Sequence, residues 1–353
     1  MDFKKIIEVL VQDNATDVFI IAGKPLTYKK NGRMEQLSDN IIKPVDTKEM
    51  IHTIYDYAHN RDINKFEQTG DDDFAFAIPG LARFRVNVYK QRGSWAAVLR
   101  IITFQIPKPE FFGIKDEVMK AASLDKGLVL VTGTAGSGKS TTLACIIDQI
   151  NTEKQNHIIT LEDPVEFLHP HKNSVVSQRE ISCDTENFLT ALRATLRQSP
   201  DVVLIGELRD YETIEIAMTA AETGHLILSS LHTVGASNAI DRIVDTFPAN
   251  QQHQILLQLS MVLRMVISQQ LIPTIDGTLV PVFEIMTMTQ AIKNLVREGK
   301  THQIDNAIST SAASDGMISM DKSLWELYKE QRITKETALM YAMNPDMMAR
   351  KLL

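Results

Sequence analysis

Residues 128–140 read LVLVTGTAGSGKS, and this stretch decides the fold. The apolar run at 128–131 is typical of a buried strand, and residues 133–140 fit G-x-x-x-x-G-K-[ST] at every fixed position. A helix pattern follows over 139–151. Glycines allow successive backbone N–H groups to point at one phosphate, and the N-terminus of a helix adds partial positive charge there. The stretch therefore predicts a phosphate-binding loop between a strand and a helix.

The chemistry of such a loop assigns roles to its residues. Lys139 is expected to bridge the β- and γ-phosphates of ATP, and Ser140 to coordinate Mg²⁺ through its hydroxyl. The alternative is a glycine-rich loop with a surface lysine, which needs neither the strand before it nor the helix after it. The expected nucleotide-binding set is Gly133, Thr134, Ala135, Gly136, Ser137, Gly138, Lys139, Ser140 and Thr141.

Apolar strands alternate with helices after this loop. We expect strands at 157–161, 202–205 and 226–231, and helices at 185–198 and 210–222. This alternation is typical of a parallel sheet that helices cover on both faces. The sequence thus indicates an α/β fold for this part of the chain.

Acidic residues follow two of these strands, at the sheet edge where α/β proteins bind ligands. Glu162 and Asp163 end one strand because Pro164 interrupts it, and one of them would polarise the attacking water. Glu207 follows the strand 202–205 and would reach Mg²⁺ through a water molecule. The structural alternatives are a solvated acidic turn at Glu162 and an acid beside a helix N-cap at Glu207.

Two histidines lie close to the same edge. His225 precedes the strand 226–231 and His232 ends it. His232 is a candidate sensor of the γ-phosphate, and the alternative for both is a hydrogen-bonded structural role. Metal ligation is not expected, because neither histidine has cysteine or further histidine nearby.

The N-terminal region follows a different pattern. Helices are expected at 2–12 and 47–67, and turn signals at Asn31-Gly32 and Pro79-Gly80 mark hairpins. Strand-like segments occur at 18–21, 25–29, 74–78, 83–89 and 96–101. These elements predict an α+β unit with an antiparallel sheet.

Two further features divide the chain. Pro107 and Pro109 favour an extended segment, which we take as a domain boundary. From about residue 250 onward the sequence favours helices, apart from a possible hairpin at Asp276-Gly277. The sequence therefore predicts two or three structural units.

Composition excludes several classes of protein. The 353 residues carry 37 Lys and Arg against 44 Asp and Glu, a net charge of −7, which argues against a protein that coats nucleic acid. Only two cysteines occur, so a disulfide framework and a four-cysteine zinc site are excluded. The N-terminus lacks a signal-peptide pattern and no apolar run approaches the ~18 residues of a membrane span. We expect a soluble, cytosolic protein.

Together these segments resemble the secretion ATPase superfamily, the hexameric motors of type IV pili and type II secretion. Residues 133–140 look like its Walker A loop, 160–166 like its Asp box, 204–207 like its atypical Walker B segment and 223–233 like its His box. The segment AIKNLVREGK at 291–300 is similar to the AIRNLIRE signature of the pilus-retraction branch. The lack of a four-cysteine zinc segment also separates the chain from the assembly ATPases.

The resemblance implies a domain organisation. A RecA-like P-loop NTPase domain at 113–290 would follow an N-terminal α+β (PAS-like) domain at 1–105 and a linker at 106–112, and a helical C-terminal segment would occupy 291–353. It also implies an ATPase that uses ATP and Mg²⁺, assembles as a homohexamer and powers pilus retraction. Its partners would be an inner-membrane pilus platform protein (PilC-like) and a related accessory ATPase, at the inner face of the cytoplasmic membrane. Neither nucleic-acid binding nor insertion into the membrane is implied.

The resemblance also supplies arginines that act from a neighbouring subunit. The segment ARFRVNV at 82–88 matches a family strand, which implies that Arg83 and Arg85 approach the γ-phosphate, with Arg100 as a further candidate. The alternative for each is a surface salt bridge. The expected catalytic set is therefore Glu162, Glu207, Lys139, Arg83, Arg85 and His232, with Ser140 and Glu207 at the metal.

The sequence departs from the family at Ala135, at Ser229-Ser230 and at Lys293, none of which removes a phosphate or metal ligand. Three alternatives stay open. The chain is compatible with an assembly or accessory ATPase of the same superfamily, with a RecA-type nucleic-acid motor and with a small-molecule kinase. The acidic balance argues against the nucleic-acid motor, and no acceptor site indicates a kinase.

Overall fold

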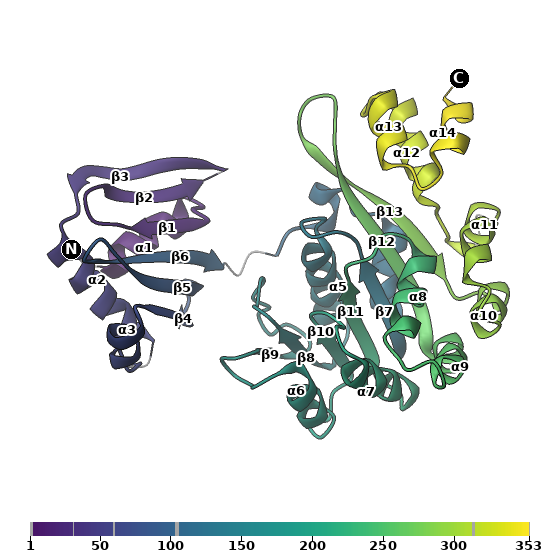
Figure 1. Ribbon diagram of the computed structural model, residues 1–353, viewed down its shortest axis with the longest axis horizontal. Coiled ribbons are helices and arrows are strands. Elements are labelled where there is room, and N and C mark those ends of the chain that lie inside the picture. The colour runs from purple at the N-terminus through teal and green to yellow at the C-terminus, as the bar shows by residue number, and fades with distance from the viewer. Residues whose placement is uncertain (1–2, 31, 59–60, 103–105, 313–314, 353) are drawn as a thin grey trace. The chain divides into compact units, whose positions relative to one another are not determined.

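The computed structural model describes residues 3–30, 32–58, 61–102, 106–312 and 315–352. The chain divides into two compact units, residues 1–105 with 166–168, and residues 106–165 with 169–353 (Figure 1). Both units combine helices with a sheet, so the expected α/β fold class is confirmed. Residues 103–105, at the end of the expected N-terminal domain, lie outside the described residues.

The smaller unit is built on an antiparallel sheet with strand order β3-β2-β1-β6-β5-β4. Its strands alternate buried and exposed residues, as in β4, because helices cover one face of the sheet. Its elements are α1(Phe3–Gln12), β1(Asp17–Ile20), β2(Pro25–Lys30), β3(Arg33–Ile41), α2(Pro44–Tyr57), α3(Asn64–Thr69), β4(Asp71–Ile78), β5(Ala82–Gln91) and β6(Ser94–Ile102).

One prediction for this unit was wrong, and one strand was not anticipated. The single helix expected at 47–67 is divided into α2 and α3. Pro44 at the first turn sets the start of α2, and an Asp62 carboxylate that accepts the Asn64 N–H shapes the chain before α3. The strand β3 was not expected because its residues are mostly polar and exposed at the sheet edge. The hairpin expected at Pro79-Gly80 is confirmed between β4 and β5.

The larger unit contains a sheet with strand order β13-β12-β7-β11-β10-β8-β9. All neighbouring strands are parallel except the pair β12 and β13. The strands are β7(Gly127–Thr132), β8(His157–Glu162), β9(Val175–Glu180), β10(Val202–Ile205), β11(Leu226–Leu231), β12(Leu263–Pro273) and β13(Leu279–Thr287).

Helices cover both faces of this sheet, as the sequence predicts. The strands β7, β10 and β11 are buried throughout, and separate apolar clusters pack against the two faces. One cluster includes α5(Lys139–Glu153), and the other includes α6(Phe188–Thr195), α7(Tyr211–Glu222), α8(Ala236–Asp245) and α9(Gln252–Val262). A parallel sheet enclosed in this way positions its strand ends at one edge for ligand binding.

The prediction that residues after 250 are mainly helical was wrong for β12 and β13, which extend the central sheet. The hairpin expected at Asp276-Gly277 is correct, but its strands are far longer than the sequence suggested. The reason is that a nearly continuous apolar run, such as the one in β12, fits a buried strand and a buried helix equally well. The helix expected at 185–198 is also shorter, since Asn187 caps α6 by accepting the Thr190 N–H.

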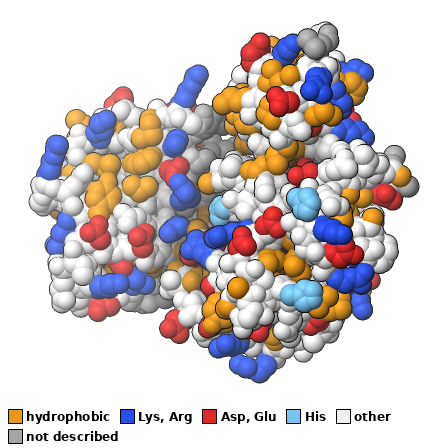
Figure 2. Space-filling model, turned by 45° about the vertical axis from the view of Figure 1, so that its right-hand side comes forward, with side chains coloured by type: hydrophobic (Ala, Val, Ile, Leu, Met, Phe, Trp, Pro, Cys, Tyr) orange, Lys and Arg blue, Asp and Glu red, His pale blue; other side chains and the backbone are white. Residues whose placement is uncertain are grey.

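Short helices follow the hairpin and pack a small apolar core against β12 and β13. Ahead of β7 lie η1(Pro109–Phe112), α4(Asp116–Met119) and η2(Lys120–Ser123); after β13 come α10(Gln290–Arg297), η3(Thr301–Gln303), α11(Ile304–Ser309), α12(Met320–Lys329), α13(Lys335–Tyr341) and α14(Pro345–Lys351). Among the described residues, no helix combines the length and the apolar character that crossing a bilayer requires. The faces seen in Figure 2 carry acidic and basic side chains intermixed with hydrophobic ones.

Candidate nucleotide-binding and catalytic site

The loop between β7 and α5 requires glycine where the chain passes close to β12. A Cβ on Gly133 would lie 2.2 Å from the Gln269 carbonyl oxygen and 2.6 Å from Ser137 Oγ. Gly138 has a φ of +88°, and a Cβ there would lie 2.9 Å from Gln269 Nε2. The glycines of the motif therefore allow both the curl of the loop and its contact with β12.

Gln269 holds the loop from β12 and was not anticipated from the sequence. Its side-chain Nε2 donates to the Ser137 carbonyl at 2.7 Å, and its Oε1 accepts from Thr142 Oγ1 at 2.7 Å. The side chain is buried, so both hydrogen bonds are shielded from water. No sequence motif marks this residue, because its partners lie more than 120 positions away.

Lys139 lies inside the curl of the loop. Its ammonium donates to the carbonyls of Gly133 at 2.9 Å and Thr134 at 3.0 Å, and lies 3.5 Å from His232 Nδ1. The side chain is largely buried although it is charged, because the loop carbonyls satisfy it. The lysine is thus positioned where the motif places a phosphate.

Glu207 lies at the end of β10 and faces His232 at the end of β11. The distance from His232 Nε2 to Glu207 Oε2 is 3.3 Å, and the Arg209 guanidinium forms an ion pair with the other carboxylate oxygen. Burial raises the pKa of Glu207, but the Arg209 hydrogen bond and the charges of Arg209 and His232 outweigh it, so the pKa is lowered overall. Glu207 is accordingly an anion at neutral pH.

The structure therefore joins three of the predicted residues in one chain of contacts: Lys139, His232 and Glu207. Arg209 extends this chain of contacts and was not predicted from the sequence, although it follows Glu207 by only two positions.

The nearby serines that depart from the family pattern also have a role here. Ser229 Oγ and Ser230 Oγ donate at 2.6 Å to the last carbonyls of the neighbouring strand segment, at Ile205 and Gly206.

Glu162 ends β8, one strand further along the sheet. Its carboxylate accepts from Thr160 Oγ1 at 2.6 Å and from Gln178 Nε2 at 3.2 Å. Gly206 allows the close approach of this strand end, since a Cβ there would lie 3.3 Å from the Leu161 carbonyl and 3.5 Å from Glu162 Cα. Glu162 thus shares the edge with Glu207, but hydrogen bonds from its own strand and from β9 orient it.

The residues predicted for Mg²⁺ offer suitable chemistry. Ser140 is exposed in the first turn of α5, and Glu207 supplies an ionised carboxylate. Hydroxyl and carboxylate oxygens are the ligands that Mg²⁺ prefers, usually together with water and substrate phosphates. Among the described residues, no group of three or more His, Cys, Asp or Glu side chains is placed to hold a metal by itself. The donor set therefore fits a metal that enters with a nucleotide.

A cavity of about 610 Å³ adjoins the loop on the side of α5. Its walls include Gly136 and Thr141, together with Phe111 and Phe112 of η1 and with Arg332 from the turn between α12 and α13. The Phe111 side chain is 82% exposed, which is unusual for a large aromatic ring. Aromatic rings and an arginine beside a phosphate loop suit a nucleobase. From the sequence, Phe111 and Phe112 were expected only in the linker, and Arg332 only in the helical C-terminal segment.

Buried polar groups support the loop that follows His232. Ser268 Oγ in β12 accepts the Gly235 N–H at 2.8 Å. Its cross-strand neighbour Glu284 accepts the Ala236 N–H at 2.8 Å and the Met320 N–H at 3.4 Å, at the starts of α8 and α12. Burial raises the pKa of Glu284 to about 7. These residues connect the loop after His232 to the C-terminal helices.

The predicted arginines lie in the smaller unit, on the sheet face opposite its core. Arg83 and Arg85 alternate with buried Phe84 and Val86 along β5. Arg85 is exposed and stands directly opposite Arg100 of β6, whose guanidinium pairs with Asp17 at 3.1 Å. Arg100 therefore forms a surface salt bridge, which was the alternative to a catalytic role for each of these arginines. The roles of Arg83 and Arg85 toward a nucleotide stay predictions.

Comparison with known proteins identifies the family. Residues 2–335 match the family model described as type II/IV secretion system protein. The chain belongs to this family. It is 41% identical to the type IV pilus retraction ATPase PilT of Pseudomonas aeruginosa over 98% of this chain and 99% of that protein. It is 38% identical to the type IV pilus ATPase PilU of the same organism, over 97% of this chain and 89% of that protein.

A solved structure agrees with this assignment to the type II/IV secretion system family. The crystal structure described as the pilus retraction motor PilT with bound ADP superposes with a TM-score of 0.88 at 42% identity, covering 98% of both chains. The fold is therefore that of a secretion ATPase along essentially the whole chain. The expected family and fold are confirmed, whereas the individual site residues are supported only by the contacts described above.

Proposed function

We propose that this protein is the ATPase that powers retraction of type IV pili. The observation that carries the proposal is the connected set of Lys139, His232 and Glu207 at one sheet edge, in a chain that resembles PilT over its whole length. In such a set the lysine would bind the phosphates of ATP, and the acid would lie near the γ-phosphate. The histidine between them would shift when the γ-phosphate binds or leaves.

ATP would bind with its phosphates in the loop and its base in the adjoining cavity. Phe111 and Arg332 would contact the adenine, and Lys139 would leave the loop carbonyls to bind the β- and γ-phosphates. Ser140 and Glu207 would hold Mg²⁺, which neutralises charge on the phosphates. Sequestration of the base by residues of η1 makes this short segment sensitive to nucleotide binding.

Hydrolysis would use the acids at the sheet edge. Glu207 stays ionised because Arg209 and His232 balance the cost of its burial. Glu162, which is hydrogen-bonded to Thr160 and Gln178, would orient the attacking water. We infer that His232 lies between the lysine and the acid so that loss of the γ-phosphate changes its contacts.

We further propose that the active form is a homohexamer. Arginines of the smaller unit, Arg83 and Arg85, would complete the site of a neighbouring subunit, and cycles of closure would do mechanical work on an inner-membrane platform protein (PilC-like). The protein would then act at the inner face of the cytoplasmic membrane. The similarity to PilU leaves an accessory retraction role as the second candidate.

Gene deletion in the host tests the proposed function. Loss of a retraction ATPase should give abundant, long pili and no twitching motility, and the wild-type gene should restore motility whereas a Glu207→Gln allele should not. Loss of pili would contradict retraction and indicate an assembly ATPase. A deletion strain that still retracts its pili, but with reduced force, would favour the accessory role.

A biochemical test separates the proposal from a nucleic-acid motor. The purified protein should release phosphate from ATP without DNA, and DNA should not raise the rate. A strong stimulation by single-stranded DNA would contradict the pilus assignment. Phosphate release in the absence of any acceptor would also argue against a small-molecule kinase.

A further inference from the structure

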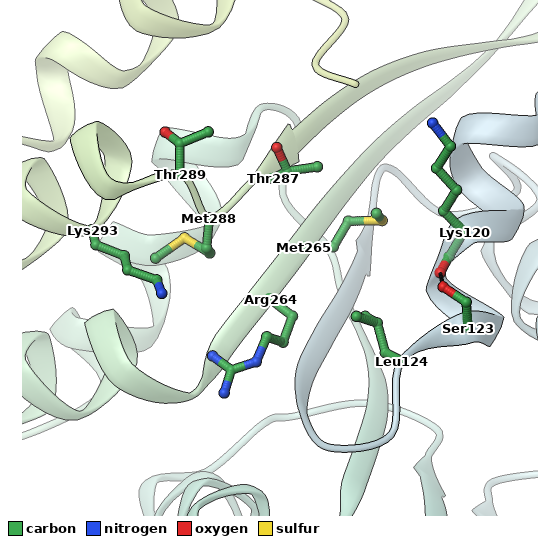
Figure 3. Close-up of a pocket in the computed structure, with 9 residues that line it drawn as sticks. All are labelled: Lys120, Ser123, Leu124, Arg264, Met265, Thr287, Met288, Thr289 and Lys293. Atoms are coloured by element: carbon green, nitrogen blue, oxygen red, sulfur yellow. Dashed lines mark hydrogen bonds between the residues drawn. The ribbon is translucent and has the colours of Figure 1, made fainter. Parts of the chain in front are cut away.

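A further cavity, with three basic residues and several apolar ones in its wall, lies at the edge of the larger sheet opposite the nucleotide-binding loop. It has a volume of about 380 Å³ and is walled by η2, the start of β12, the end of β13 and α10 (Figure 3). Arg264 of β12 lies in its wall, whereas Gln269 of the same strand contacts the loop. Five residues of a strand span roughly 16 Å, so the cavity is distinct from the nucleotide site.

The charged residues of this cavity are all basic. Lys120, Arg264 and Lys293 line it, and no acidic residue does. Within the described part of the chain, none of the three forms an ion pair with a carboxylate. Figure 3 shows the Arg264 guanidinium and the Lys293 ammonium pointing toward one another. Two cations that converge without an acid repel each other, and an anion between them would reverse that cost.

The hydrogen-bond donors of Arg264 are only partly used. One terminal nitrogen, Nη1, donates to the carbonyls of Met261 at 2.6 Å and Leu263 at 3.2 Å, near the end of α9. These contacts fix the guanidinium plane and leave Nε and the other terminal nitrogen for a ligand. The arginine is thus pre-oriented rather than freely mobile.

Two further residues of the cavity wall carry donors, but only the Lys293 ammonium points toward Arg264, whereas the Thr289 hydroxyl points away from it (Figure 3). Thr289 Oγ1 accepts the Ile292 N–H at 3.3 Å, so its hydroxyl hydrogen is available. Lys293, one turn into α10, contributes three N–H donors. By contrast, Thr287 and Ser123 already donate to backbone carbonyls, at 2.8 and 2.7 Å.

We propose that this cavity binds a phosphate group, carried either by a phosphorylated small molecule or by the headgroup of an anionic phospholipid. A guanidinium and an ammonium together offer more donors than the two oxygens of a carboxylate accept, and they suit the several oxygens of a phosphate. Leu124, Met265 and Met288 add an apolar wall, which fits the organic part of a phosphate ester.

Calorimetric titration of inorganic phosphate tests the site. The full-length protein is first saturated with a non-hydrolysable ATP analogue and Mg²⁺, so that the P-loop is occupied. We expect saturable binding that Lys293→Gln weakens about tenfold and that Lys293→Arg preserves. Lys126→Gln is the matched control, because Lys126 is an exposed lysine just before β7 and does not line the cavity. Arg264→Gln should also weaken binding.

Vesicle sedimentation distinguishes the source of the phosphate. If the ligand is a lipid headgroup, equal mixtures of phosphatidylglycerol and phosphatidylcholine will retain the wild type and the Lys126→Gln variant better than Lys293→Gln. If the ligand is a soluble phosphate ester, the titration will show the difference and the vesicles will not. The proposal is overturned if neither assay shows binding below about 10 mM phosphate, or if Lys293→Gln and Lys126→Gln behave alike in both.

Discussion

His232 touches both a cation and an anion of the candidate site. Its Nδ1 lies 3.5 Å from the Lys139 ammonium, and its Nε2 lies 3.3 Å from a Glu207 oxygen. Loss of either contact would free the imidazole to reorient. The residue therefore connects the phosphate loop to the acid at the end of β10.

Glu207→Gln should abolish turnover while the protein stays folded. The amide has the size of the carboxylate but no charge, so we expect kcat for ATP to fall by about 10²-fold or more. Phosphate release and circular dichroism measure the two properties. Glu222→Gln is the matched control, because Glu222 is an exposed acid at the end of α7. Activity near that of the wild type in Glu207→Gln would refute the assignment.

Glu284 should make stability depend on pH near neutrality. Its folded-state pKa is raised by burial to about 7, above the ordinary value of a glutamate. The folded protein then holds a proton that the unfolded chain has lost, so the free energy of unfolding should fall as pH rises from about 5 to 7. The slope from this group approaches about 1.4 kcal/mol per pH unit.

Denaturant unfolding of the wild type and Glu284→Gln at several pH values checks this. The glutamine keeps an acceptor for the Ala236 N–H but cannot ionise, so the difference between the two proteins should vary with pH in that window and level off above about 7. Asp305 and Asp321 raise the pKa further and stay in both proteins. A difference that is constant with pH would contradict the expectation.

At the scale of elements, β5 and β6 bring two arginines side by side. Arg85 and Arg100 are directly opposed in the register, and like charges so placed are destabilising. Asp17 of β1 relieves Arg100 through an ion pair at 3.1 Å. Arg85 has no such pair among the described residues, which makes it the better candidate for contact with a γ-phosphate.

Arg85→Ala should therefore reduce kcat on the order of 10³-fold with little loss of stability. Arg100→Ala should lose only an exposed ion pair, a change of about 0–1 kcal/mol in the free energy of unfolding, with a smaller effect on turnover. Steady-state phosphate release and thermal unfolding compare the two variants. The reverse order of effects on kcat would assign the catalytic arginine to Arg100.

The sequence was sufficient for the elements that carry strong local signals. The phosphate loop, the buried strands of the parallel sheet and the turn at Asp276-Gly277 all follow from composition and spacing. It failed for β3 and β9, whose polar residues lie at sheet edges, and it underestimated β12, where an apolar run fits a helix as well as a strand. In these three strands the secondary structure is determined by pairing with strands that are distant in the sequence, which no short stretch of residues reveals.

The candidate site shows the same division. Residues in motifs, such as Lys139 and Glu207, were identified because their spacing carries the chemistry. Gln269 and Phe111 were not, because the fold brings them to the loop and to the adjoining cavity from positions with no motif. Arg209 is intermediate, since it is adjacent to a motif but acquires its role only when the chain places its guanidinium on Glu207.

At the scale of the whole molecule, the proposed hexamer predicts complementation between inactive subunits. Rings assembled from a mixture of Arg85→Ala and Glu207→Gln subunits would contain some interfaces with an intact arginine on one side and an intact acid on the other. If Arg85 acts on the neighbouring subunit, these interfaces should hydrolyse ATP, although each variant alone does not.

Subunits must be unfolded together and refolded, or co-expressed with different tags, so that mixed rings form. Phosphate release from the doubly purified rings is the measurement, and rings of each single variant are the controls. Absence of activity in mixed rings of confirmed hexameric size would show that the arginine acts within its own chain.

Three consecutive residues of β12 serve three different parts of the larger unit. Ser268 binds the loop after His232, Gln269 binds the phosphate loop, and Gln270 donates to the Tyr341 carbonyl at 3.2 Å. A one-residue shift of this strand would exchange all three partners at once. Point substitutions should therefore be tolerated in β12 far better than insertions or deletions. We expect changes of chain length during evolution to fall in the exposed turn at 274–278 instead.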